Sequence, residues 1–327
     1  MSQTITAPAP VAAGNRTLRW TRRNAAVVLI YGITAALVIV ASIMSPTFRD
    51  VANITDVLRQ SIVLGLVTIG QLFVILAGGT DMSVGMAARV VGLGVAVALT
   101  STMLPPILVI VLGLLAGALI GLLNGLLVAR FGAQPFIVTL GTMGVLYGLA
   151  LAISDGPTGM VPRSVVAIYE MKIGPLPASV IVMAMLWLAT WWVLRSSRFG
   201  RATYAVGGSP SVSRLAGLNV NRVLILTYTI SGVCAAAAGI FLLARSGVGN
   251  PNMALGLEFQ SIVAAAIGGV SLYGGRGSLV GALGAVLLIS VISNLFDLFQ
   301  ISAYFQDLTL GVIVVLAVAI YRADKNK

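Results

Sequence analysis

Long apolar runs separated by short polar segments make up most of the chain, and they predict membrane-spanning helices. A helix that crosses a bilayer needs about 20 apolar residues, because a rise of about 1.5 Å per residue must cover roughly 30 Å. By this measure we expect about ten transmembrane helices, at 24–48, 58–78, 82–102, 107–129, 133–153, 176–194, 223–244, 258–273, 278–297 and 303–321. The pattern predicts an all-α polytopic membrane protein.

The two ends of this pattern give the domain boundaries. A basic tail at 1–24 precedes a membrane domain at 25–322, and 323–327 form a short C-terminal tail. The first apolar run exceeds the roughly 7–15 residues of a signal-peptide core, so we expect an uncleaved span. The weakest predictions are span eight, which paired glycines interrupt, and span ten, where Asp307 leaves 14 charge-free residues.

Composition supports this class and narrows the chemistry. Hydrophobic residues make up 58% of the chain and charged residues 9%, whereas soluble domains carry about 25% charged residues. This excludes a soluble globular protein, a disordered chain and a secreted disulfide scaffold. The sequence has no histidine, one cysteine (Cys234) and no phosphate-binding loop motif. We therefore expect no catalytic site, no metal site and no cofactor, and the protein is not expected to be an enzyme.

The charges predict an orientation. Ten spans put both termini on one side, and with that side cytosolic the inner segments hold 14 Lys and Arg and 2 acids, against 5 and 7 outside. This excess of inner basic residues follows the positive-inside rule. The net charge of +11 is therefore attributed to topology, and no nucleic-acid partner is expected.

Two charges fall near or inside a span. A charge at the bilayer centre costs at least about 2.5–3.5 kcal/mol. We expect Asp81 to lie at the inner boundary, where a carboxylate can cap the start of the third span. Arg89 follows eight residues later, and its side chain is expected to extend back to the cytosolic surface. A direct pair between Asp81 and Arg89 stays open.

Neutral polar and aromatic side chains inside spans are candidates for a solute path. A hydroxyl-rich solute needs donors, acceptors and an aromatic surface, and the candidates are Gln71, Asn124, Asn294 and Phe136. For each polar residue the alternative is a hydrogen bond between helices. Four glycines at 113, 117, 121 and 125 likewise form one smooth helix face, which suits either static packing, the favoured interpretation, or a sliding surface.

A loop at 195–222 carries five arginines and no acid, and it contains a short predicted helix at 210–216. Ser209 suits the N-cap, Pro210 the first helical position and Gly217 the position after the end. Six or seven residues cannot span a membrane, so this element favours docking to another protein. The alternative is an ordinary basic loop near anionic lipid.

Three ordered segments resemble bacterial ABC importer permeases of the ribose type. Residues 204–222 resemble that family's coupling segment, 78–85 resemble its G-G-x-D-L-S-V-G motif, and 267–277 resemble L-G-G-x-S-L-x-G-G-x-G. The second and third segments also resemble each other, through internal duplication or chance. The resemblance covers about 25–322, and the residues that match its two glycine motifs are Gly79, Asp81, Ser83, Gly85, Gly274, Gly275 and Gly277.

This resemblance implies the membrane subunit of an ATP-driven importer, which moves a sugar or similar small polar solute inward by alternating access. The implied partners are a second permease subunit, identical or different, a cytosolic ABC ATPase, an extracytoplasmic solute-binding protein and the lipid of the bacterial cell (inner) membrane. The ATPase would dock on the short cytosolic helix between spans six and seven, through Ser209, Pro210, Val212, Arg214, Leu215 and Gly217.

Two departures from the family leave the substrate class open. Gln260 stands where the family usually has Asp, and Arg89 where it has an apolar or small residue. One alternative is therefore an ABC permease for branched-chain amino acids. The other is an ion-coupled secondary transporter, although such proteins typically use intramembrane acids to couple ions.

Overall fold

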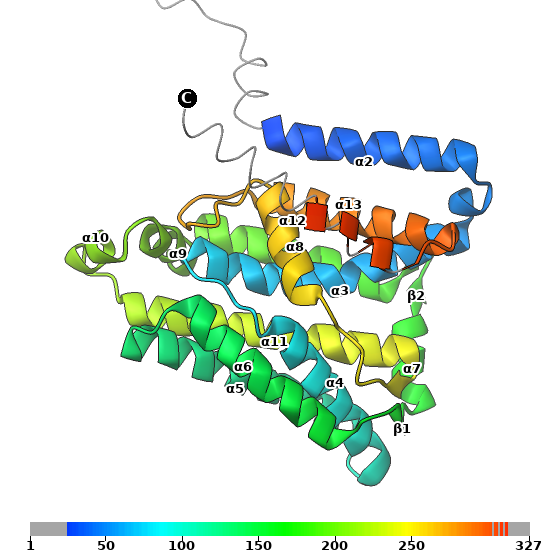
Figure 1. The fold of residues 1–327 in the computed structure, drawn as a ribbon, viewed down its shortest axis with the longest axis horizontal. Helices are drawn as coiled ribbons and strands as arrows, with labels where there is room; N and C mark the ends of the chain where they lie inside the picture. Colours follow the sequence, from blue (N-terminus) through cyan, green and yellow to red (C-terminus); the bar gives the residue numbers. More distant parts are fainter. Residues whose placement is uncertain (1–24, 303, 307, 310, 313–327) are drawn as a thin grey trace, which may run out of the picture.

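The computed structural model describes residues 25–312, apart from 303, 307 and 310. Helices dominate this part of the chain, and only very short strands accompany them (Figure 1). In chain order the elements are α2 (Ala25–Met44), η1 (Thr47–Arg49), α3 (Val51–Leu76), α4 (Val84–Ser101), α5 (Pro106–Phe131), α6 (Pro135–Ile153), β1 (Thr158–Met160), α7 (Arg163–Glu170), β2 (Lys172–Ile173), β3 (Leu176–Pro177), α8 (Ala178–Ser196), α9 (Arg198–Gly208), α10 (Pro210–Leu215), α11 (Val220–Ser246), β4 (Val248–Gly249), α12 (Leu257–Ile267) and α13 (Leu279–Leu298).

Eight helices of the described residues are long and apolar enough to cross a membrane, namely α2 to α6, α8, α11 and α13. They match eight predicted spans, so the prediction of an all-α polytopic membrane protein is confirmed. Predicted span eight is only the 11-residue helix α12, which stops at Gly268 because Gly269 turns the chain with a φ of +80°. Predicted span ten, at 303–321, and both predicted tails lie largely or wholly outside the described residues.

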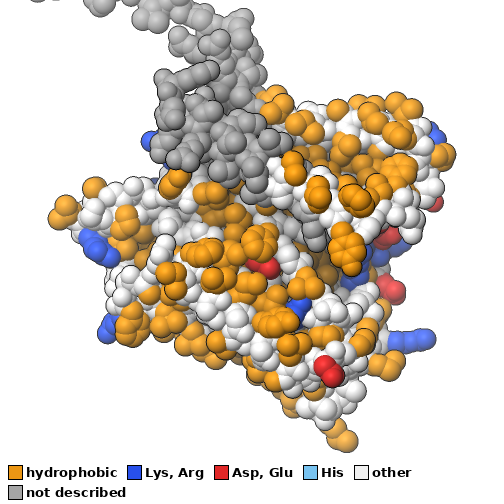
Figure 2. Space-filling view, in the orientation of Figure 1, with side chains coloured by type: hydrophobic (Ala, Val, Ile, Leu, Met, Phe, Trp, Pro, Cys, Tyr) orange, Lys and Arg blue, Asp and Glu red, His pale blue; other side chains and the backbone are white. Residues whose placement is uncertain are grey.

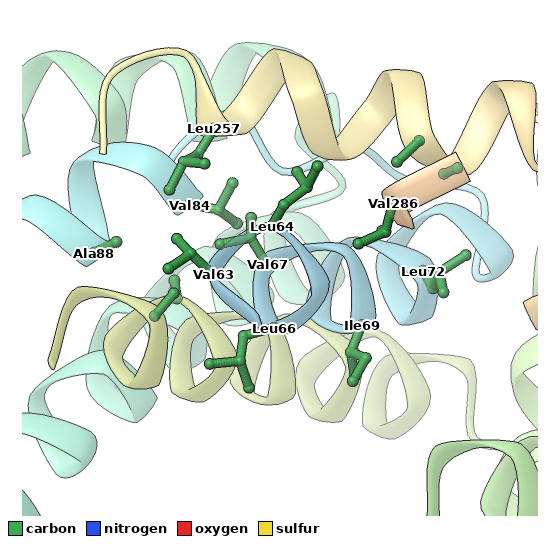
Figure 3. Packing of buried hydrophobic residues seen from close by; sticks show 14 of the residues in the cluster. Val63, Leu64, Leu66, Val67, Ile69, Leu72, Val84, Ala88, Leu257 and Val286 are labelled. Atoms are coloured by element: carbon green, nitrogen blue, oxygen red, sulfur yellow. The ribbon is translucent and has the colours of Figure 1, made fainter. Parts of the chain in front are cut away.

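Helix α3 forms the centre of the bundle. Its residues from Ser61 to Leu76 are all buried, whereas most surface helices bury a single stripe. Figure 3 shows side chains from several sides of α3 packed against α4, α12 and α13, through Val84, Leu257 and Val286 among others. Elements that touch α3 are therefore coupled through one contiguous apolar core.

The four glycines of α5 pack against α11. A Cβ atom built at Gly125 would lie 2.8 Å from the Ile225 Cα atom, and one at Gly121 would overlap the carbonyl oxygen of Tyr228. Backbones this close exclude larger side chains, which is how small residues drive helix association in lipid. The geometry agrees with the favoured interpretation of this stripe as close packing.

The molecule has two distinct ends (Figure 1). Helices α9 and α10 project at one end, while α7 and the strands β1 and β2 lie at the opposite end. On the face drawn in Figure 2, the charged side chains at the α10 end are basic, and both signs occur at the other end. Apolar atoms cover most of the surface between them.

The chain between α11 and α12 returns without regular structure. After β4 it runs through turns to the start of α12, and both Ala254, at a φ of 63°, and Gly256, at 77°, adopt left-handed conformations. Ala254 is also buried. A left-handed backbone is uncommon for a residue with a side chain, so tertiary contacts hold this segment in place.

Candidate functional site

The predicted short helix is confirmed as α10. The Ser209 hydroxyl accepts from the Val212 N–H at 3.3 Å, Pro210 opens the helix, and Gly217 ends it with a φ of +80°. Bonds from Gly217 N–H to Arg214 O and from Leu218 N–H to Ser213 O complete a Schellman cap. The result is a rigid, capped element at the tip of the molecule.

This helix presents apolar side chains that have no partner within the described chain. Leu215 is 90% exposed and Val212 61%, and being three residues apart they share one face. Arg214, in the last turn, lies beside them. Exposed apolar residues on a rigid projection are typical of a docking surface.

Behind α10, two glycine turns and the glycine-rich end of α9 meet in what we call the glycine junction: Gly78, Gly274–Gly275 and Gly207–Gly208. A Cβ atom built at Gly274 would lie 2.7 Å from the Gly78 Cα atom, and one at Gly275 equally close to the Gly208 Cα atom. The Gly275 N–H also donates to Leu76 O at 3.0 Å. The two similar motifs of the sequence therefore touch, and both contact the end of α9.

Two further motif positions also sit against close neighbours. Gly277 faces Val270 and Leu76, where an added Cβ would lie 2.8 and 3.0 Å from side-chain carbons. Tyr204 on α9 donates to the Gly277 carbonyl at 3.5 Å, and burial raises the pKa of its phenol, which keeps the proton available for this bond. The glycine junction thus links α9, and the helix α10 that follows it, to the ends of α3 and α12.

Asp81 lies at the centre of a buried hydrogen-bond network. Its carboxyl group accepts from the Ser83 N–H (3.0 Å), the Ser83 hydroxyl (2.6 Å) and the Ser231 hydroxyl on α11 (2.8 Å). Ser83 accepts from Asn124 on α5, at 2.9 Å, and Asn124 accepts from Thr142 on α6, at 2.6 Å. These residues, with Gln71, are called the Asp81 network below.

The prediction that Asp81 lies at the inner boundary is wrong. It is 1% exposed and bonds to Ser231, which follows Val220 by eleven residues, or about 16 Å along α11. The loop before α4 therefore folds back into the bundle. Asp81 does sit before α4, where it binds the N–H of the N-cap residue Ser83 rather than capping the helix itself.

The four candidates for a solute path occupy different environments. Gln71 and Asn124 are fully buried in the Asp81 network, where the Gln71 amide is placed to pair with the Asp81 backbone. Asn294 exchanges two hydrogen bonds with Asn53, at 2.9 and 3.1 Å. Phe136 is 46% exposed on α6. Their role in a solute path stays a prediction.

The prediction that Arg89 reaches the cytosolic surface is also wrong. The side chain is 1% exposed, its Nε donates to the Met253 carbonyl at 3.3 Å, and its guanidinium lies 5.8 Å from the centre of the Tyr147 ring. Arg89 therefore points towards α6 and the irregular segment before α12. It forms no hydrogen bond with Asp81 among the described residues.

Sequence reasoning singled out Asp81 and Arg89 but not Glu258, a third buried charged residue. It lies in the first turn of α12, is 3% exposed, and its carboxylate rests on Gly85, where an added Cβ would overlap Oε2. A signal existed, because Glu258 is an acid between Leu257 and Phe259 in an otherwise apolar stretch. Nearby Gln260 lines a different space, a cavity of about 160 Å³ to which Gln60, Ser290 and Ser293 also contribute polar groups.

Comparison with known proteins gives the family. The model of a family described as branched-chain amino acid transport system / permease component matches residues 53–318. The ribose import permease protein RbsC of Bacillus subtilis is 37% identical over 290 residues, 88% of this chain and 89% of that protein. The D-allose transport system permease protein AlsC of Escherichia coli is 33% identical over 292 residues, 89% of this chain and 90% of its own.

The fructose import permease protein FrcC of Rhizobium meliloti is 35% identical over 305 residues, 90% of this chain and 84% of that protein. Together with the apolar helices, these relatives confirm the predicted resemblance and a multi-pass location in the cell membrane. The chain belongs to the family of branched-chain amino acid transport system permease components.

Proposed function

We propose that this chain is the membrane subunit of an ATP-driven ABC importer for a sugar or a similar neutral polar solute. Relatives named for ribose, allose and fructose import support the substrate class. The observation that carries the proposal is α10, a capped helix that exposes Leu215 and Val212 at the tip of the molecule. ATP hydrolysis is assigned to a separate subunit that docks there.

The glycine junction suggests how docking reaches the membrane helices. Displacement of α10 moves α9, whose end touches the turns after α3 and before α13 with no side chains between them. Close-packed elements transmit strain because little free volume absorbs it. ATP-driven movement of the docked subunit would in this way alternate the access of a solute path in the membrane.

The remaining partners follow from the two ends of the molecule. With the basic α10 end in the cytosol, α7 and strands β2 and β3 face outward, where a solute-binding protein would dock. A second permease subunit would complete the solute path. Lipid chains would fill an apolar groove of about 570 Å³ between α3, α8 and α13, which Trp187, Leu188 and Trp191 line among others.

The rival substrate class is branched-chain amino acids, which the family description favours. Uptake of D-ribose against L-leucine by the reconstituted importer separates the two. Ion-coupled transport would use intramembrane acids, and the structure buries Asp81 and Glu258 in the bundle. If uptake stops when the ATPase subunit is left out, the result favours an ATP-driven importer over an ion-coupled transporter.

The docking proposal is tested with Leu215→Asp. A charge at the centre of an apolar contact should abolish co-purification of the ATPase and solute uptake, while insertion stays normal. Met103→Asp is the matched control, because Met103 is also an exposed apolar residue but lies between α4 and α5, away from α10. Arg214→Ala should cause a milder, salt-sensitive loss. Normal ATPase binding by Leu215→Asp would reject α10 as the docking element.

Orientation is tested with single cysteines in a Cys234→Ala background. Ser164 on α7 and Ser209 at α10 lie at opposite ends of the molecule. An impermeant thiol reagent applied to whole cells should label a cysteine at position 164 and not one at 209. The reverse labelling would contradict the proposed orientation.

A further inference from the structure

Arg89 and Glu258 bury opposite charges close together without satisfying them. The two side chains are 1% and 3% exposed, and neither the Arg89 Nη2 atom nor the Glu258 Oε2 atom has a hydrogen-bond partner among the described residues. Their charges interact electrostatically. A buried polar atom without a partner loses its hydrogen bonds to water and gains none from the protein. This costs about 1–3 kcal/mol, and more for a charged group.

The two groups lie on one side of α4. Glu258 rests on Gly85, and Arg89 follows Gly85 by four residues, which places both contacts on the same helix face about one turn apart. Arg89 is held at one side by its bond to Met253 O, and the Tyr147 ring lies over its guanidinium. Tyr147 is itself 49% exposed, so the ring that lies over the Arg89 guanidinium reaches the molecular surface.

Charged side chains interrupt the apolar surface at the level where α12 and α4 begin. Figure 2 shows an acidic and a basic patch close together near the middle of the face it draws, over this region. Ionisable groups at such depth face a bundle interior or a water-filled cavity rather than lipid. The irregular backbone at 250–256 follows the same rule, because non-helical chain at membrane depth is found where it is buried or lines a cavity.

We propose that the Arg89 Nη2 atom and the Glu258 Oε2 atom form an intramembrane binding site for a neutral polyhydroxy solute. Arg89 donates to a hydroxyl oxygen, and Glu258 accepts from a hydroxyl hydrogen, which gives both atoms the partners they lack. Both atoms are covered in this conformation, so solute reaches them when the transporter changes state. The assignment rests on the proposed function and names the residues that contact the solute.

The charge of the pair selects the class of solute. One cation and one anion sum to zero, so a neutral solute completes the hydrogen bonds without adding a buried charge. A sugar acid or phosphate would meet the Glu258 carboxylate, and like charges at close range in a poorly solvated site repel strongly. Tyr147 adds an aromatic surface, on which the apolar face of a sugar ring can rest.

The test is uptake of radiolabelled D-ribose, D-allose and D-fructose by the complete importer in vesicles, with saturating sugar-loaded binding protein. The double variant Arg89→Met/Glu258→Leu removes both charges, and replacing a buried pair with apolar residues of similar volume is often neutral for stability. We expect normal insertion and ATPase co-purification, with sugar uptake about 10- to 100-fold slower. Arg59→Met is the matched control, because Arg59 also lies over a tyrosine ring, that of Tyr169, but away from Glu258.

The following outcomes would contradict the proposal that the Arg89–Glu258 pair binds the solute. Wild-type uptake by the double variant would make the pair purely structural. If the double variant fails to assemble, the test is repeated with Glu258→Gln, which keeps the shape of the side chain and removes its charge. Unchanged uptake by Glu258→Gln would overturn the assignment. If the wild-type importer takes up none of the three sugars, the proposed substrate class is overturned as well. If the wild type takes up a sugar, the uptake by the variants tests only the role of the Arg89–Glu258 pair.

Discussion

Two buried charged regions lie beside α4, and they differ in how completely their hydrogen bonds are made. In the Asp81 network the carboxyl group accepts three hydrogen bonds, and the chain of partners extends through Ser83 and Asn124 to α5 and α6. In the second region, Arg89 on α4 and Glu258 on α12 each keep a buried polar atom without a partner among the described residues. Both regions exclude solvent, so exposure does not explain the difference.

This difference favours a structural role for the Asp81 network and a binding role for the Arg89–Glu258 pair. A buried polar group that has all its partners rigidifies the bundle, because any motion would break bonds in a low-dielectric interior. A buried group that lacks partners gains stability when a ligand supplies them. The Asp81 network therefore fixes the positions of α4, α5, α6 and α11, and the Arg89–Glu258 pair is positioned on that fixed frame.

Asp81→Ala should have the largest effect. It leaves the Ser83 N–H and two hydroxyl groups buried without an acceptor, which costs roughly 3–5 kcal/mol in total. We expect little folded protein in the membrane. The measurement is the monodisperse fraction and the thermal midpoint of the detergent-solubilised subunit.

Asp81→Asn is the control for shape. Its Oδ1 atom can still accept both bonds from Ser83, and only the bond from Ser231 loses its acceptor, so it should lose less stability than Asp81→Ala. If Asp81→Ala instead folds normally and loses only transport, the contrast between the two regions fails, because Asp81 would then act on the solute.

Gly85→Ala should have the next largest effect, because it links both regions. The added methyl group would overlap Glu258 Oε2 and lie 3.0 Å from the Ala254 carbonyl oxygen, so the Glu258 side chain and the backbone at Ala254 must move, at about 1–3 kcal/mol. We expect a lower thermal midpoint together with slower uptake. Gly94→Ala on the same helix is the control, since a Cβ there meets nothing within 4 Å and alanine favours helix.

Eight spans could be predicted from the sequence because apolar runs of about 20 residues leave few alternatives. The capped helix α10 was equally predictable, since Ser209, Pro210 and Gly217 act on their immediate neighbours. Span eight was harder, because Gly268 and Gly269 end α12 after 11 residues and the preceding turns depend on tertiary contacts.

The two charged regions could be located only in part. Asp81 and Arg89 stand out in the sequence, but their depth depends on the loop before α4 folding back into the bundle. Partners more than 140 residues away, Ser231 for Asp81 and Met253 for Arg89, leave no local signal. The sequence analysis placed the loop before α4 at the membrane boundary, and it therefore placed both charges too near the surface.

Asn124→Ala should have a moderate effect confined to stability. It removes one hydrogen bond to Ser83 and one from Thr142, at a cost of about 1–2 kcal/mol. Thr142→Val removes only the outer bond and should cost about half as much. Uptake per folded importer should stay normal in both variants. A changed sugar preference would show instead that Asn124 belongs to the solute path.

Tyr147→Leu should have the smallest effect, and on transport rather than stability. The ring centre lies 5.8 Å from the Arg89 guanidinium, and such a cation–π contact contributes about 0.5–1 kcal/mol, or roughly two- to fivefold in binding. We expect uptake to slow by that factor with an unchanged thermal midpoint, because Tyr147 is half exposed and supports little of the core. Tyr169→Leu, which removes the corresponding contact to Arg59 at 4.8 Å, should leave uptake unchanged. If the two substitutions slow uptake equally, Tyr147 has no effect that depends on its contact with Arg89. The assignment of solute binding to the Arg89–Glu258 pair, and of a structural role to the Asp81 network, would then lose this support.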